Sequence, residues 1–130
     1  MAFEPVPSNL VFLRRHVVLN RLKNVVVVPA AVASYDGVAR FSSNESSSVG
    51  QLDEAGTIEV EQVTSDRFLG SSGERPPNVI KIDVEGAELL VLKGARDSLA
   101  SHRPIIFLAT HSYELQQACR FLLIEAKYEI

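Results

Sequence analysis

A short segment, Val79-Ile80-Lys81-Ile82, is followed by two acids that are separated by one residue, Asp83 and Glu85. The segment is apolar and β-branched, which favours a buried strand, and Gly86 allows the sharp turn that comes next. Ligands of open α/β sheets bind at the carboxyl ends of the strands. Two carboxylates placed there are costly unless they are solvated, paired or used in chemistry. They are candidate functional groups, and the alternative is a solvated turn whose acids favour the start of a helix.

A histidine stands in a comparable position. His111 follows the apolar segment 105–108, which predicts a second buried strand. Asp83, Glu85 and His111 are therefore candidate general bases at strand ends, and the imidazole has the ordinary pKa best suited to proton transfer near neutral pH. The alternative for His111 is a polar residue at the entrance of a helix.

The elements around these residues predict an α/β fold in which strands and helices alternate. Helical spacing extends from 87 to 93, Gly94 is a C-cap or hinge, and 95–99 forms a second short piece. Ser112 is a predicted N-cap for a helix that continues to about Ala126, with Cys119 as a small core residue on its apolar face.

The first half of the chain predicts a helix over 7–23, with an apolar stripe at Leu10, Leu13 and Val17 that Val18 and Leu22 continue. A short strand is expected at 25–28, and a small antiparallel excursion within 31–66, including a Ser-rich loop at 42–50 and an exposed strand at 57–63. A helical turn at 65–69, a polar loop at 70–77 and the start of a strand at 128 complete the prediction.

Composition limits the class of protein. The chain has 130 residues, of which 46% are hydrophobic and 22% charged, so it suits one globular domain. Its net charge of -3 argues against a general nucleic-acid binder. One cysteine excludes an internal disulfide, no Cys/His cluster has zinc spacing, and no apolar run has the length of a membrane span. A soluble cytoplasmic protein without a metal site is expected.

The residues IKIDVEGAE (80–88), followed by VLKGA (91–95), resemble the signature of the FkbM-type methyltransferases. The similarity is long and ungapped, and it extends over nearly the whole chain. It implies a Rossmann-like class I methyltransferase fold, with a mostly parallel sheet, flanking helices and a small antiparallel insertion. It also implies S-adenosylmethionine as the cofactor, and a hydroxyl group of a small molecule or glycan as the acceptor.

The same resemblance gives Glu4 a role. Glu4 lies in Ala2-Phe3-Glu4-Pro5, where the family has an acid at the end of its second strand that holds the ribose hydroxyls of the cofactor. A carboxylate suits that task because it can accept two hydrogen bonds from a diol. The alternative is a surface glutamate at a terminus.

The sequence also departs from the family pattern. No Gly-x-Gly occurs, so the first strand and the Gly-rich cofactor loop are expected to be absent, and Ala109 stands where many members have Glu. A truncated sheet that keeps only the strands at 25, 80 and 105 would have unpaired edges. The chain is therefore expected to form a homodimer through those edges or to be marginally folded. The alternative to an enzyme is a non-catalytic remnant that binds no cofactor.

Overall fold

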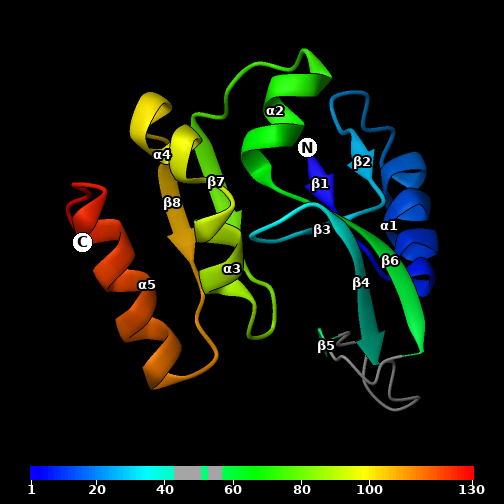
Figure 1. Ribbon diagram of the computed structural model, residues 1–130. Coiled ribbons are helices and arrows are strands. Elements are labelled where there is room, and N and C mark those ends of the chain that lie inside the picture. The colour runs from blue at the N-terminus through cyan, green and yellow to red at the C-terminus, as the bar shows by residue number, and fades with distance from the viewer. Residues whose placement is uncertain (43–50, 53–56) are drawn as a thin grey trace. The chain divides into compact units, whose positions relative to one another are not determined.

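The computed structural model describes residues 1–42, 51–52 and 57–130. The chain divides into two compact units, of which the first contains Met1–Ala31 and Gly37–Gln62 and the second contains Val32–Asp36 and Val63–Ile130. Each unit combines strands with helices, as Figure 1 shows. Most of the predicted Ser-rich loop at 42–50 lies outside the described residues.

The first unit begins with a parallel pair of very short strands. β1 (Ala2–Phe3) pairs with β2 (Val27–Val28), and Ala2 is opposite Val27 in the register. The expectation that only the strands near 25, 80 and 105 remain is therefore wrong, because the two residues before Glu4 form a paired strand. The predicted strand at 25–28 is present only at its last two residues.

The helix between these strands, α1 (Pro7–Leu19), is shorter than predicted. Asn20 caps it by donating from its backbone and side-chain nitrogens to the carbonyl oxygen of His16, and Arg21 then adopts a left-handed conformation with φ 53°. The helix therefore ends before Asn24. Leu10 is buried, whereas Val18 is 74% exposed, so the predicted continuation of the apolar stripe is wrong.

An antiparallel sheet follows, as predicted. Its strands are β3 (Ala31–Val32), β4 (Gly37–Ser42), β5 (Gln51–Leu52) and β6 (Ile58–Val63). Their order in the sheet is β3-β6-β4-β5, and β4 pairs antiparallel with β6 and with β5. In β6 the residues alternate between the two faces, and Gln62 is buried beside Val60 rather than exposed with the glutamates.

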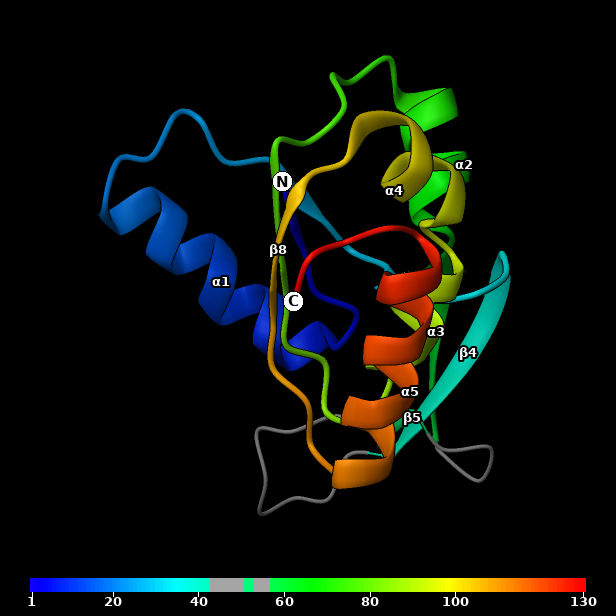
Figure 2. The ribbon, with the colours of Figure 1, turned by 90° about the vertical axis from the view of Figure 1, so that its left-hand side faces the viewer.

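The second unit contains the other parallel pair, which the sequence placed correctly. β7 (Val79–Ile82) pairs with β8 (Ile105–Leu108), and Ile82 is opposite Leu108. Two helices, α3 (Glu88–Lys93) and α5 (Tyr113–Glu125), lie on the same side of this pair in Figure 2. Residues 128–130, predicted to start a strand, form none in the described part of the unit.

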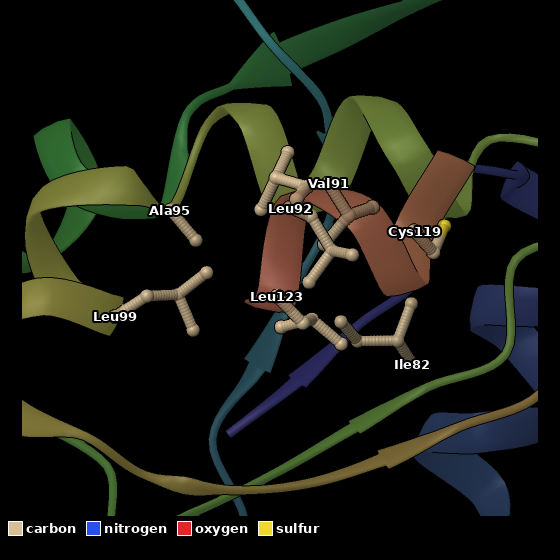
Figure 3. Packing of buried hydrophobic residues seen from close by; sticks show 8 residues of the cluster. Ile82, Val91, Leu92, Ala95, Leu99, Cys119 and Leu123 are labelled. Carbon is tan, nitrogen blue, oxygen red and sulfur yellow. The ribbon is translucent and has the colours of Figure 1, made fainter. Parts of the chain in front are cut away.

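The core of the second unit lies between the β7–β8 pair and its helices (Figure 3). Leu92 and Cys119 are fully buried, and Ile82 contributes from β7. The apolar stripe predicted for α5 is confirmed, because Cys119 and Leu122 are buried on one face of that helix. The core contains Ile82, Val91, Leu92, Ala95, Leu99, Cys119, Leu122 and Leu123.

Two further helices complete this unit, α2 (Ser65–Ser72) and α4 (Arg96–His102). α2 is longer than the predicted turn at 65–69. Its N-cap Thr64 accepts a hydrogen bond from the Arg67 backbone, and Gly73 ends it with φ 69°, a left-handed conformation that glycine adopts easily. Much of the predicted loop at 70–77 is thus its last turn and C-cap.

The carboxylate of Asp66 caps α4 from the neighbouring helix α2. It accepts hydrogen bonds from the backbone of Asp97 at 2.9 Å and of Ser98 at 2.8 Å, and from the Ser98 hydroxyl at 2.5 Å. The N-cap residue of α4 itself, Ala95, makes no side-chain cap bond. Asp66 thus satisfies amide groups that the helix start would otherwise leave without partners.

Replacing Asp66 by Ala is expected to lower the free energy of unfolding by about 1–2 kcal/mol, because α4 loses its cap. Urea denaturation followed by circular dichroism measures the change. The matched control is Asp97→Ala, which removes an exposed acid from the same helix start but none of these three bonds. Equal destabilisation by the two variants would contradict the capping role.

In the part of the chain that the structure describes, no helix is long and apolar enough to cross a membrane.

Candidate functional site

The segment after β8 places His111 next to the end of β7. Ala109 donates its backbone N–H to the carbonyl oxygen of Ile82, which holds the two strand ends together. Ser112 then caps α5, as predicted, by accepting a hydrogen bond from the backbone of Leu115 at 3.1 Å. His111 is fixed between these two anchors, and its side chain is 33% exposed.

The turn after β7 directs its two acids toward this imidazole. Glu85 has φ 28° and Gly86 has φ 97°, and the N–H of Ala87 donates to the carbonyl oxygen of Val84 at 2.9 Å. A left-handed conformation at a non-glycine residue is a strain that the surrounding structure must hold in place. The imidazole Nε2 lies 3.3 Å from a Glu85 oxygen and 3.8 Å from an Asp83 oxygen.

Asp83 has a second partner, which comes from β7. Lys81 Nζ donates to Asp83 Oδ2 at 2.7 Å. The hydrogen bond and the positive charge of Lys81 hold the pKa of Asp83 below its ordinary value, and His111 adds a smaller effect in the same direction. Asp83 is therefore a carboxylate at neutral pH, which suits it to accept a hydrogen bond rather than to donate one.

The structure adds a residue that was not among the predicted candidates. Glu88, the first residue of α3, is fully buried, and its Oε1 lies 2.5 Å from Nδ1 of His111. The same oxygen accepts the backbone N–H of Gly86 at 3.0 Å. The signal was present in the sequence, because Glu88 shares an apolar helix face with Val91 and Leu92, and a charge on such a face needs a partner.

The imidazole and the carboxylates shift each other's pKa values. The hydrogen bond to Glu88 raises the pKa of His111 above its ordinary 6.5 against the effect of desolvation, and the charges of Glu85, Glu88 and Asp83 reinforce it. Burial alone would raise the pKa of Glu88, but hydrogen bonds from Gly86 and His111 outweigh it, so the pKa lies below the ordinary 4.5.

The His111–Glu88 ion pair therefore stabilises the folded chain within a defined pH window. The contribution of Glu88 is present above pH 4.5 and is lost as the pH falls through its lowered pKa. The contribution of His111 is present below pH 6.5 and is lost as the pH rises through its raised pKa. Both contributions are fully present between these two values.

The predicted site residues thus fall into two groups. Asp83, Glu85 and His111 come together in the second unit, as the sequence predicted. Glu4 lies in the first unit at the end of β1, where its Oε1 accepts the backbone N–H of Val6 at 2.8 Å. Across residues 1–42, 51–52 and 57–130, no group of three or more His, Cys, Asp and Glu side chains has the arrangement of a metal site.

Comparison with known proteins decides the family. A family model described as the methyltransferase FkbM domain matches residues 1–130. The chain belongs to the FkbM methyltransferase family. The resemblance that the motif at 80–95 predicted is confirmed. Asp83, Glu85 and Glu88 all lie within the matched FkbM domain.

Two individual proteins are similar to this FkbM chain. Hexuronic acid methyltransferase AglP of Haloferax volcanii is 33% identical over 104 residues, which cover 77% of this chain and 42% of that protein. The crystal structure of the methyltransferase FkbM of Methylobacillus flagellatus KT matches with a TM-score of 0.68 at 20% identity, covering 94% of this chain and 29% of that one.

The structural match confirms the predicted fold class, an α/β arrangement with parallel strands and helices of the FkbM type. This chain spans less than half the length of either protein, 42% of one and 29% of the other.

Proposed function

We propose that this FkbM-family chain serves methyl transfer from S-adenosylmethionine to a hydroxyl group of a sugar, with glycans that contain hexuronic acid as the acceptor class. Membership of a methyltransferase family and the similarity to a hexuronic acid methyltransferase support the reaction and the acceptor. The main structural support for the proposal is a candidate base, the imidazole of His111, whose Nε2 lies 3.3 Å from a carboxylate oxygen of Glu85 after the end of β7.

Bound S-adenosylmethionine would supply an electrophilic methyl group on a sulfonium sulfur. The chain must then align an acceptor oxygen with that methyl group and remove the hydroxyl proton as the new O–C bond forms and the C–S bond breaks. Neutral His111 accepts the proton at Nε2. Asp83, Glu85 and Glu88 then surround the resulting imidazolium with negative charge, which makes His111 a stronger base.

A hexuronic acid offers both hydroxyl groups and a carboxylate. The carboxylates of Asp83 and Glu85 are 44% and 39% exposed, so they form an acidic surface beside His111. Such a surface keeps the carboxylate of a hexuronic acid away from His111, whereas it can accept hydrogen bonds from the hydroxyl groups of the same sugar. A carboxylate also has no proton to lose, so it would make no use of the base. Both arguments favour ether formation over ester formation.

Glu4 suits the ribose of S-adenosylmethionine. A carboxylate has about four acceptor positions, and the N–H of Val6 occupies one position on Oε1. The backbone N–H of Glu4 donates to Val28 at 3.1 Å, which fixes the residue at the end of the β1–β2 pair. Glu4 is thus held rigidly with capacity left for a diol.

Replacing Glu4 by Gln is expected to weaken the binding of S-adenosylhomocysteine by about 10- to 100-fold, because a hydrogen bond to a charged group contributes about 1.5–3 kcal/mol. Gln keeps an acceptor for the Val6 N–H, so the start of α1 should persist. Isothermal titration measures the dissociation constant, with Glu74→Gln on the exposed surface as the control. Equal affinity of Glu4→Gln and the parent for S-adenosylhomocysteine would contradict the proposed role of Glu4 in binding the ribose.

The reaction itself is tested with S-adenosylmethionine that carries an isotopically labelled methyl group. The acceptors are glycans with hexuronic acid and otherwise identical neutral glycans. We expect label in the hexuronic acid glycans, in a product that resists mild alkaline hydrolysis, as an ether does. Alkali-labile label would identify an ester and overturn the hydroxyl assignment, and no transfer to any acceptor would contradict the proposal.

A further inference from the structure

Glu88 is a buried acid that the reaction as described above does not touch directly. Its side chain is fully buried, and its second oxygen, Oε2, has no hydrogen-bond partner among the described residues. A buried carboxylate is costly unless a charged or hydrogen-bonded partner compensates it. Its side-chain partner is the imidazole of His111, 2.5 Å away.

The two nitrogens of the imidazole therefore face different surroundings. Nδ1 meets the buried carboxylate of Glu88, whose position is fixed by the Gly86 N–H and by the start of α3. Nε2 faces the partly exposed carboxylates of Asp83 and Glu85 at longer distances, 3.8 and 3.3 Å. The partly exposed acids that an incoming substrate could approach, Asp83 and Glu85, thus lie on the Nε2 side.

We propose that Glu88 is a positioning residue that keeps the proton of neutral His111 on Nδ1, so that Nε2 is the nitrogen that accepts the proton of the substrate hydroxyl. A short hydrogen bond from one ring nitrogen to a carboxylate fixes both the tautomer and the orientation of an imidazole. This inference rests on the proposed role of His111 as the base.

The charges around His111 distinguish Glu88 from its neighbours. Asp83 is already bound to Lys81, and Glu85 lies in a strained turn with φ 28°. Burial raises the pKa of the Cys119 thiol in α5, and the charge of Glu88 adds a smaller effect in the same direction, so the thiol stays neutral. Glu88 is the fully buried acid of this group, and removing its charge should therefore affect His111 most.

The test is a pH titration of the histidine side chains by nitrogen-15 NMR, which reports both the tautomer and the pKa of His111. In the parent chain we expect protonated Nδ1 in the neutral form and a pKa above 6.5. In Glu88→Gln, which keeps the shape but not the charge, we expect the pKa of His111 to fall and the tautomer preference to weaken. The control is Glu114→Gln, an exposed acid on the first turn of α5.

An unchanged tautomer and pKa in a folded Glu88→Gln protein would overturn the inference. In kinetic measurements of Glu88→Gln, we expect kcat to fall by up to about 10²-fold while KM is preserved. The acidic limb of its pH–rate profile should move to lower pH. An unaltered kcat would overturn it as well. The NMR titration needs no activity, so failure of the proposed function, seen as no methyl transfer by the parent protein, is distinguished from failure of this inference.

Discussion

Replacing His111 by Gln is expected to lower the rate of methyl transfer by about 10²–10⁴-fold, the usual contribution of a positioned general base. Gln can still form hydrogen bonds with Glu88 and Glu85, but it cannot accept the hydroxyl proton. Binding of S-adenosylhomocysteine should be retained, because the loss affects proton transfer and not the cofactor. Initial rates with the labelled cofactor measure the change.

The pH dependence of this effect has a definite sign. The raised pKa of His111 means that the neutral, basic form becomes dominant only above the ordinary 6.5, so the parent rate should rise as the pH increases through that region. This rise of the rate with pH should be absent in His111→Gln. His102→Gln, at the exposed end of α4, is the matched control. Equal activity of His111→Gln and His102→Gln would contradict the role of His111 as the general base.

The second large effect concerns Gly94, at the end of α3. A Cβ atom at this position would lie 1.9 Å from the carbonyl oxygen of Ala33 and 3.0 Å from its carbonyl carbon. The φ of −83° is open to any residue, so the glycine is required by space and not by backbone conformation. Ala33 is itself held by a hydrogen bond from its N–H to Val63.

Gly94→Ala is therefore expected to destabilise the chain by about 3 kcal/mol or more, because backbone atoms must move to admit the methyl group. That is a large part of the 5–15 kcal/mol that typically separates folded from unfolded domains. The control is Gly70→Ala in α2, where nothing lies within 4 Å and alanine should stabilise the helix. Thermal denaturation compares the two, and similar melting temperatures would contradict the close contact.

Local patterns in the sequence predicted the elements of the second unit well. The bounds of β8 at 105–108 and the N-cap at Ser112 are confirmed, because a buried strand and a capped helix depend on neighbouring residues alone. The proximity of Asp83, Glu85 and His111 also followed from the sequence, since the carboxyl ends of parallel strands lie at one edge of a sheet.

Contacts between distant segments could not be predicted in this way. The bond from Glu88 to His111 spans 23 residues, and the cap that Asp66 provides for α4 spans 31 and 32. The short pairing of Ala2–Phe3 with Val27–Val28 is also set by register and not by local propensity. The end of α1 at Leu19 was missed because Arg21 adopts a left-handed φ, which the residue type does not reveal.

Isothermal titration of the parent protein with S-adenosylhomocysteine tests whether this chain acts with S-adenosylmethionine. We expect saturable binding with a micromolar dissociation constant, which corresponds to a binding free energy of about −8 kcal/mol. His111→Gln should bind as tightly as the parent, and Glu4→Gln more weakly. The absence of saturable binding by a folded parent protein would contradict the proposed use of S-adenosylmethionine and favour a non-catalytic member of the FkbM family.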